Sequence, residues 1–187
     1  MKPNPFLRNL FHLLGILVPL LYLHLGDLFL YLFFPLATLF LLLEFFRLQV
    51  AVAGEWYLRL FGPLLRPGEY DRPSGAFYFA LGTVLTILLF PGDIAVSALL
   101  VLALSDPAAA IIGRRYGKRR IFGKTLAGSL AFFLSAWFTL TIYFGDNLFR
   151  QLPAALLGTL VEALPSPLND NLTIPVAVGL AGYLMLR

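Results

Sequence analysis

The sequence predicts an all-α membrane protein: one membrane-embedded domain, residues 1–187, with about seven transmembrane helices and a cytosolic N-terminus. Composition is the first observation, because 59% of the residues are hydrophobic and only 13% are charged, whereas a soluble domain of this size carries more charge on its surface. The second is that long apolar stretches alternate with short clusters of turn-forming residues. That alternation is typical of helices that cross a bilayer repeatedly.

Seven apolar stretches approach the ~20 residues that a membrane-crossing helix needs. Four contain no Asp, Glu, Lys or Arg, and the other three contain one to three charges each. In chain order, the predicted helices are 9–26, 27–52, 74–92, 94–113, 125–145, 148–164 and 171–186. Between the second and the third, the run 55–61 mixes aromatic and aliphatic residues with one charge of each sign. This run predicts a short amphipathic helix at the membrane surface.

The distribution of charge predicts how these helices are oriented. Three short turns, 24–27, 91–93 and 145–147, each carry an Asp and no Lys or Arg. Twelve of the 14 basic residues fall on the segments at the other side. Cytosolic loops of membrane proteins carry the excess of Lys and Arg, so the N-terminus and the basic loops are expected in the cytosol. The chain has no cysteine, which excludes disulfides and thiolate chemistry.

Asp106 is the clearest candidate for a functional residue inside the bilayer. It follows twelve uncharged residues and precedes the small-residue stretch 107–110. A charged side chain near the bilayer centre costs about 2.5 to 3.5 kcal/mol on insertion scales, so it is usually functional. The alternative is a buried Asp satisfied by the backbone or by a Ser.

The segment 113–125 combines six basic residues with three glycines. Glycines let backbone N–H groups approach phosphate oxygens, and Arg and Lys supply the charge, so the segment is suited to a polyphosphate. The alternative is a basic loop that only fixes orientation and touches anionic lipid. The residues predicted to bind phosphate are Gly113, Arg114, Arg115, Gly117, Lys118, Gly123, Lys124, Thr125, Gly128 and Ser129.

A second polar cluster, 166–175, precedes the last predicted helix and contains Asp170, Asn171 and Thr173. Its oxygen-rich side chains suit Mg²⁺, which takes one or two carboxylates together with substrate phosphates. The alternative is that Asp170 or Asn171 caps the helix. Supporting roles are weaker hypotheses for five further residues, which could instead be solvated, paired with each other or packed: His12, Glu44, Arg47, Glu69 and Glu162.

Several motifs, taken in order, resemble the family of CTP-dependent lipid-alcohol kinases, which includes dolichol, phytol and farnesol kinases and the CTP-dependent diacylglycerol kinase. The strongest resemblance is in 105–118, SDPAAAIIGRRYGK, continued by 123–129, GKTLAGS. The C-terminal motif 170–175, DNLTIP, also matches closely. Shorter similarities occur at 8–12, 44–47, 66–69 and 74–79. One departure is Ala127, where the family has Glu.

The resemblance implies transfer of the γ-phosphoryl group of CTP to the hydroxyl of a membrane lipid alcohol at the cytosolic face. It implies catalytic roles for Asp106, Lys124 and Asp170, with Mg²⁺ held by the two Asp residues and nucleotide contacts from the phosphate-binding set, Asn171 and Thr173. Polyprenol or dolichol, a phytol-type prenol and diacylglycerol all stay open as acceptors, as do UTP and ATP as donors. The expected partners are membrane lipids and no nucleic acid, and a homodimer is one alternative for the assembly.

Two other functions are alternatives to this interpretation. A phosphatidate cytidylyltransferase also uses CTP in the membrane, but the Lys-Asp and His-Gly-Gly-rich signature of that enzyme is absent from 166–175. A transporter needs charges that line a route through the membrane. Here the charges gather toward one face, and no internal repeat divides the chain into halves.

Overall fold

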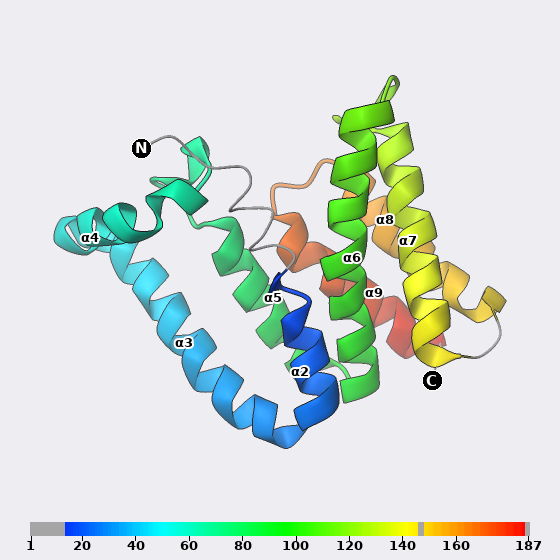
Figure 1. Cartoon of the computed structure of the whole chain (residues 1–187), viewed down its shortest axis with the longest axis horizontal. Helices are drawn as coiled ribbons and strands as arrows, with labels where there is room; N and C mark the ends of the chain where they lie inside the picture. The colour runs from blue at the N-terminus through cyan, green and yellow to red at the C-terminus, as the bar shows by residue number, and fades with distance from the viewer. Residues whose placement is uncertain (1–13, 146–147, 186–187) are drawn as a thin grey trace.

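The computed structural model describes residues 14–145 and 148–185. Helices and one short hairpin make up the regular secondary structure of the described part (Figure 1). The α-helices are α2 (Leu17–Leu25), α3 (Asp27–Gln49), α4 (Ala51–Phe61), α5 (Gly75–Leu89), α6 (Gly92–Tyr116), α7 (Leu126–Phe144), α8 (Leu152–Ala163) and α9 (Asp170–Met185). Short 3₁₀ turns are η1 (Gly62–Leu64), η2 (Pro67–Glu69) and η3 (Leu148–Gln151), and the strands are β1 (Arg120–Ile121) and β2 (Lys124–Thr125).

Each of the seven predicted ranges overlaps an α-helix, and α4 includes the predicted surface helix 55–61 but begins four residues earlier. By length and composition, α3, α6 and α7 can each cross a membrane. The apolar helix α5 is shorter, with 15 residues. The structure therefore confirms an all-α protein with three candidate membrane-spanning helices, whereas seven spans and a cytosolic N-terminus stay predictions. His12 lies outside the described residues.

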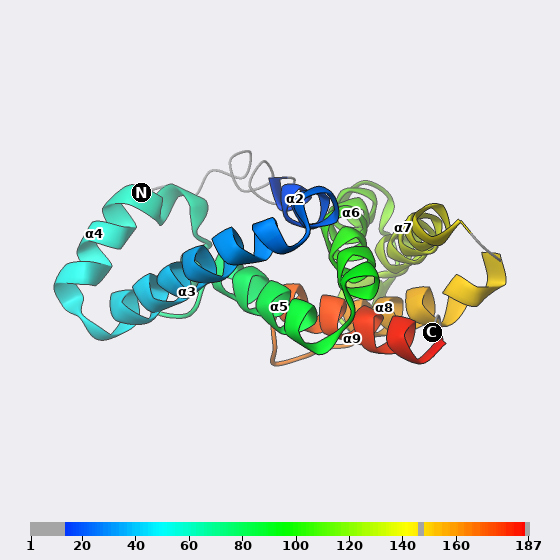
Figure 2. The same cartoon turned by 90° about the horizontal axis from the view of Figure 1, so that it is seen from below.

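Helix α6 is the centre of the structure. Its residues 94–103 are all buried, and it packs against α2, α5, α7 and α9. Phe132, Ala136 and Leu140 of α7 and Ile174 and Val178 of α9 complete the main core. Many core positions are Ala or Gly, and small residues let membrane helices approach closely. Figure 2 shows α3 and α4 at one end of the molecule and α7 at the other.

The connections lie at two opposite ends of the helices. The hairpin, the connection from α4 to α5 and the connection from α8 to α9 lie toward the top of Figure 1. The turns from α2 to α3, from α5 to α6 and at the end of α7 lie toward the bottom. These are the basic and the acidic groups of connections distinguished in the sequence, so the hairpin that carries Lys124 and the connection that leads to Asp170 lie toward the same end of the structure.

Candidate active site

The segment 113–125 differs from the predicted glycine-rich loop. Helix α6 continues through Tyr116, so Arg114 and Arg115 occupy its last turn, where positive charge is favourable for the helix dipole. A two-residue hairpin follows, with Ile121 paired to Lys124. Its central residues, Phe122 and Gly123, have φ of 52° and 92°, as in the turns that match the twist of short hairpins.

Lys124 contacts two carboxylates from other parts of the chain. Its Nζ lies 2.8 Å from Asp170 Oδ2, at the start of α9, and 3.2 Å from Glu162 Oε1, near the end of α8. The Glu162 side chain is only 4% exposed, and its Oε2 accepts a hydrogen bond of 3.0 Å from Ser129 Oγ. Hairpin, α7, α8 and α9 thus each contribute one residue to a cluster, which we call the lysine cluster: Lys124, Ser129, Glu162 and Asp170.

The electrostatics of the lysine cluster keep Lys124 charged. Burial alone lowers the pKa of its ammonium group, but the hydrogen bond and charge of Asp170, followed by the charge and hydrogen bond of Glu162, outweigh it, so the pKa is raised overall. Lys124 is therefore a permanent cation at neutral pH. Such a cation can bind phosphate oxygens, but it cannot take up a proton as a base.

Three of the glycines predicted to shape a phosphate site have a packing function in the structure. A Cβ on Gly113 would lie 2.7 Å from Thr125 Oγ1, and one on Gly128 would lie 3.0 Å from the Ala109 carbonyl oxygen. A Cβ on Gly117 would also collide with Thr125. Thr125 caps α7, because its Oγ1 accepts a hydrogen bond of 3.1 Å from the Gly128 N–H. These residues bring α6 and α7 together, and their contact with nucleotide stays a prediction.

The other predicted catalytic and basic residues lie on α6 and just beyond it. Asp106 is partly buried and follows Ser105, whose hydroxyl lies 3.2 Å from that of Ser135 on α7. Arg114, Arg115 and Lys118 are exposed. Among the described residues these three cations form no ion pair, so the structure leaves them outside the lysine cluster.

A metal site is not preassembled in the described part of the chain. No group of three or more His, Cys, Asp or Glu is placed there to hold an ion. Glu162 and Asp170 nevertheless converge on one ammonium group. Two carboxylates suffice for a Mg²⁺ that arrives with nucleotide phosphates, so the donor set fits that ion.

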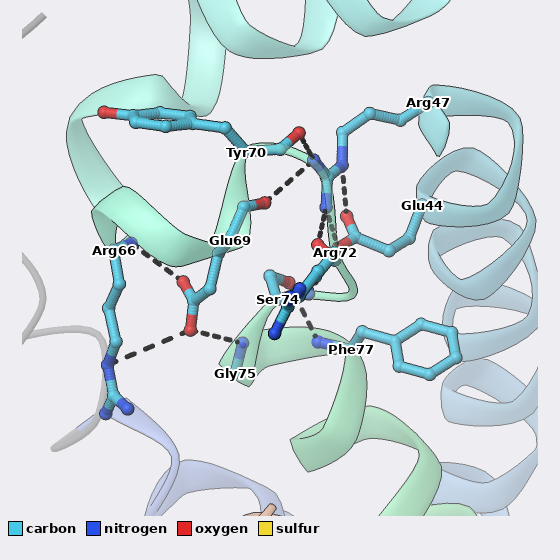
Figure 3. Close-up of polar contacts among 9 residues, drawn as sticks. All are labelled: Glu44, Arg47, Arg66, Glu69, Tyr70, Arg72, Ser74, Gly75 and Phe77. Carbon is cyan, nitrogen blue, oxygen red and sulfur yellow. Dashed lines mark hydrogen bonds and ion pairs between the residues drawn. The ribbon is translucent and has the colours of Figure 1, made fainter. Parts of the chain in front are cut away.

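A second polar network surrounds Arg47 at the end of α3 (Figure 3). Its guanidinium forms a double interaction with Glu44, through Nη2 at 2.6 Å and Nε at 3.2 Å. The remaining N–H groups donate to the carbonyl oxygens of Glu69, Tyr70 and Arg72 at 3.1, 3.0 and 2.8 Å. All five guanidinium donors are thereby used. The hypothesis that Glu44 and Arg47 neutralise each other is confirmed, and the pair also fixes the connection before α5.

The side chains around this pair complete its burial. Glu44 Oε1 accepts a hydrogen bond of 2.7 Å from the Ser74 N–H, and the Ser74 hydroxyl caps α5 by accepting from Phe77 N–H. The Tyr57 ring of α4 covers the Arg47 guanidinium at 4.8 Å. Burial and then the Glu44 carboxylate raise the pKa of the Tyr57 hydroxyl. Ser74 was not among the predicted site residues, although a Ser directly before an apolar run is a recognisable helix cap.

Glu69 and Asn171 connect this network to the lysine cluster. Glu69 Oε1 accepts a hydrogen bond of 3.1 Å from the Gly75 N–H, and Asn171 Nδ2 donates to the Gly75 carbonyl oxygen at 2.9 Å. Asn171 follows Asp170 directly in α9. Asn169, and neither Asp170 nor Asn171, caps this helix, because its Oδ1 accepts from the Asn171 N–H at 3.0 Å. Asp170 is therefore free of a capping role and faces Lys124.

The described helices are apolar, and three of them are long enough to cross a membrane; the lysine cluster and the exposed cations at the end of α6 could bind an anion such as phosphate. Comparison with known proteins specifies the family. The chain is 33% identical over 181 residues to an uncharacterized protein of Rickettsia prowazekii, covering 91% of this chain and 89% of that one. It is 32% identical over 151 residues to CTP-dependent diacylglycerol kinase 1 of Schizosaccharomyces pombe, covering 70% and 68%.

A plant relative, probable phytol kinase 2, chloroplastic, of Glycine max, is 28% identical over 163 residues, covering 76% of this chain and 56% of that protein. No family model matches the chain, and no solved structure matches it significantly. The chain belongs to the family of CTP-dependent lipid kinases, as the sequence motifs predicted.

Proposed function

We propose that this chain transfers the γ-phosphoryl group of CTP to the free hydroxyl of diacylglycerol, at the cytosolic face of the membrane. Support for this acceptor comes from the yeast relatives named CTP-dependent diacylglycerol kinase, which are 31% to 32% identical over 70% to 73% of this chain. A phytol-type prenol is the second candidate, because relatives named probable phytol kinases are 27% to 29% identical over 64% to 76%.

The observation that carries the proposal is the position of Lys124 between Asp170 and Glu162. Phosphoryl transfer depends mainly on positioning and on neutralising the charge of the transferred group. A lysine whose charge is secured by two carboxylates can exchange one of these partners for a phosphate oxygen without changing its protonation. The carboxylate that is released is then available to the metal that accompanies the nucleotide.

In this proposal Lys124 binds the triphosphate, and Arg114, Arg115 and Lys118 supply further positive charge from the end of α6. Asp170 would hold Mg²⁺, with Glu162 or Asp106 as the second carboxylate, and the ion would supply positive charge to neutralise the phosphates. The bond from the γ-phosphorus to its bridging oxygen breaks and a bond to the lipid oxygen forms. The hydroxyl proton passes to Asp106 or Asp170, and CDP leaves.

The test is phosphate transfer from γ-labelled nucleotide by the purified protein in detergent with Mg²⁺. CTP, UTP and ATP are compared as donors, and diacylglycerol, phytol, geranylgeraniol and a long polyprenol as acceptors. Labelled phosphatidate formed with CTP is the expected product. Lys124→Ala, Asp106→Asn and Asp170→Asn should each lower kcat by two orders of magnitude or more, roughly the contribution of one charge-stabilising group. Arg59→Ala, in the exposed pair with Glu55, is the matched control and should retain full activity.

Two outcomes would contradict the proposal. Preference for phytol over diacylglycerol would transfer the assignment to the second acceptor. Release of pyrophosphate from CTP in the presence of phosphatidate, with no labelled lipid phosphate, would indicate a cytidylyltransferase instead of a kinase.

A further inference from the structure

The residue at the tip of the hairpin is unusual both in its backbone conformation and in its exposure. Phe122 has φ of 52° and is the non-glycine residue with positive φ in the described part of the chain. The left-handed region is costly for a bulky side chain, and hairpin turns of this kind usually have Asn, Asp or Gly there. The ring is also 65% exposed. Such strain persists where the conformation serves an interaction.

The residues beside Phe122 are apolar or basic. Ile121, the preceding residue, is exposed. The three residues before Ile121 are also exposed, and all are basic: Lys118, Arg119 and Arg120. Within residues 14–145 and 148–185 these three cations have no acidic partner. An exposed apolar pair beside unpaired cations is complementary to a surface that is apolar inside and negatively charged outside, which is the property of an anionic lipid leaflet.

Helix α7 places the hairpin at the level of such a surface. A row of exposed apolar residues, spaced by four, runs along the helix from the hairpin: Leu126, Leu130, Leu134, Phe138 and Ile142. With 19 residues, α7 is about 28 Å long at 1.5 Å per residue. This length nearly equals the ~30 Å hydrocarbon core of a bilayer. If α7 crosses that core, the hairpin, which begins directly before Leu126, lies among the lipid headgroups.

We propose that the hairpin docks on the anionic leaflet of the membrane, with Ile121 and Phe122 inserted between headgroups and Arg119 and Arg120 bound to lipid phosphates. Neither arginine belongs to the residues assigned above to CTP. Docking would hold the hairpin, and therefore the backbone of Lys124, at a fixed depth. In this proposal, the lipid bound by Arg119 and Arg120 is an anionic lipid of the leaflet. It is not the lipid alcohol that accepts the phosphoryl group.

The absence of cysteine from the chain permits a direct measurement of depth. A nitroxide attached to Phe122→Cys in nanodiscs reports its collisions with oxygen, which is concentrated in lipid, and with a water-soluble nickel chelate. Leu130→Cys serves as the lipid reference. In nanodiscs that contain phosphatidylglycerol, the label at 122 should be protected from the chelate and accessible to oxygen. In phosphatidylcholine alone, the protection should decrease.

The charge requirement is tested by Arg119→Gln with Arg120→Gln in the labelled protein. Removal of two cations near an anionic surface should change the ratio of docked to free hairpins by roughly 30-fold. Arg59→Gln with Arg66→Gln, which removes two exposed cations elsewhere, is the matched control and should leave the depth unchanged.

Three results would overturn the proposal: full access of the chelate to the label at 122 in the anionic nanodiscs, equal depth with and without anionic lipid, or loss of protection when CTP is added. The last result would assign Arg119 and Arg120 to the nucleotide. Because the depth measurement requires no phosphate transfer, a failure of the kinase assay would not affect its outcome.

Discussion

Lys124 lies between two carboxylates, and its titration has a testable consequence. Since the pKa of Lys124 is raised overall in the folded protein, its ion pairs contribute fully below the ordinary lysine pKa and are lost as pH rises through the folded-state value. The destabilisation caused by Lys124→Met should therefore be constant from neutral pH to about pH 9.5 and decrease only above it. Thermal unfolding in detergent across pH measures this.

The matched control is Lys118→Met, which removes an exposed lysine and should leave the unfolding temperature unchanged at every pH. If the effect of Lys124→Met disappeared near neutral pH, the ammonium group would be largely neutral there. Its role as a permanent cation would then be wrong.

Arg47 provides a prediction about stability. Its planar guanidinium uses all five donors on Glu44 and three carbonyl oxygens, a geometry that lysine cannot reproduce. Arg47→Lys keeps the charge but leaves buried carbonyl oxygens without donors, so it should destabilise the protein by about 1 to 3 kcal/mol. Arg59→Lys should have no measurable effect, because both partners of its pair with Glu55 are exposed. Equal unfolding temperatures for the two variants would contradict this interpretation.

For single residues, the sequence predicted correctly which side chains come together. It was less successful in predicting the role of each one. Lys124, Asp170, Glu162 and Ser129 were all named as candidates, and the structure brings them into contact. The packing function of Gly113 and Gly128 could not be predicted, because a glycine within or close to a basic segment equally suits a phosphate site. The pairing of Glu69 with Gly75 depends on how a loop folds, and no periodic pattern encodes that.

The helices themselves were predictable, because long apolar stretches bounded by turn residues have few other structures available in a membrane. The residues at which the helices begin and end were less predictable. Helix α6 extends three residues past the predicted end at 113, since Arg114 and Arg115 favour a last helical turn and Gly113 there serves packing. The hairpin was not predicted, because strands of two residues leave no alternating pattern, and Phe122 is an unusual residue for its turn.

The contact between α5 and α9 yields a prediction for a single methyl group. A Cβ on Gly82 would collide with the Asn171 carbonyl oxygen and lie 3.0 Å from Leu172 Cα, both parts of the backbone that cannot rotate away. Gly82→Ala should destabilise the protein by about 1 to 3 kcal/mol. It should also lower activity, because it displaces the start of α9 and with it Asp170. Unfolding and phosphate transfer, measured on the same preparation, test both effects.

Gly75→Ala is the control in the same helix. A Cβ there would meet Glu69 Oε1 at 3.5 Å and Asn171 Nδ2 at 3.6 Å, which are ordinary contacts, and both backbone hydrogen bonds of Gly75 are kept. If the two variants behaved alike, close approach of α5 and α9 would not be what positions Asp170.

For the whole molecule, the separation of basic and acidic connections to opposite ends (Figure 1) leads to a prediction of topology. Two exposed positions lie at opposite ends: Ser166, between α8 and α9, and Asp93, at the start of α6. Each can be replaced singly by cysteine. In sealed vesicles with the cytosolic side outward, an impermeant thiol reagent should label the first and not the second. Labelling of both from one side would contradict the proposed arrangement.

The distances along the chain between paired residues also bear on the order of assembly during synthesis. The carbonyl groups that Arg47 binds lie 22 to 25 residues further along the chain. The carboxylate of Asp170 lies 46 residues after Lys124. Arg47 can pair with Glu44, three residues earlier, as soon as α3 forms, whereas Lys124 has neither of its carboxylate partners until Glu162 and Asp170 follow. The lysine cluster is complete only once Asp170 has been synthesised, so a chain interrupted before that residue would lack α9 and could not form the cluster.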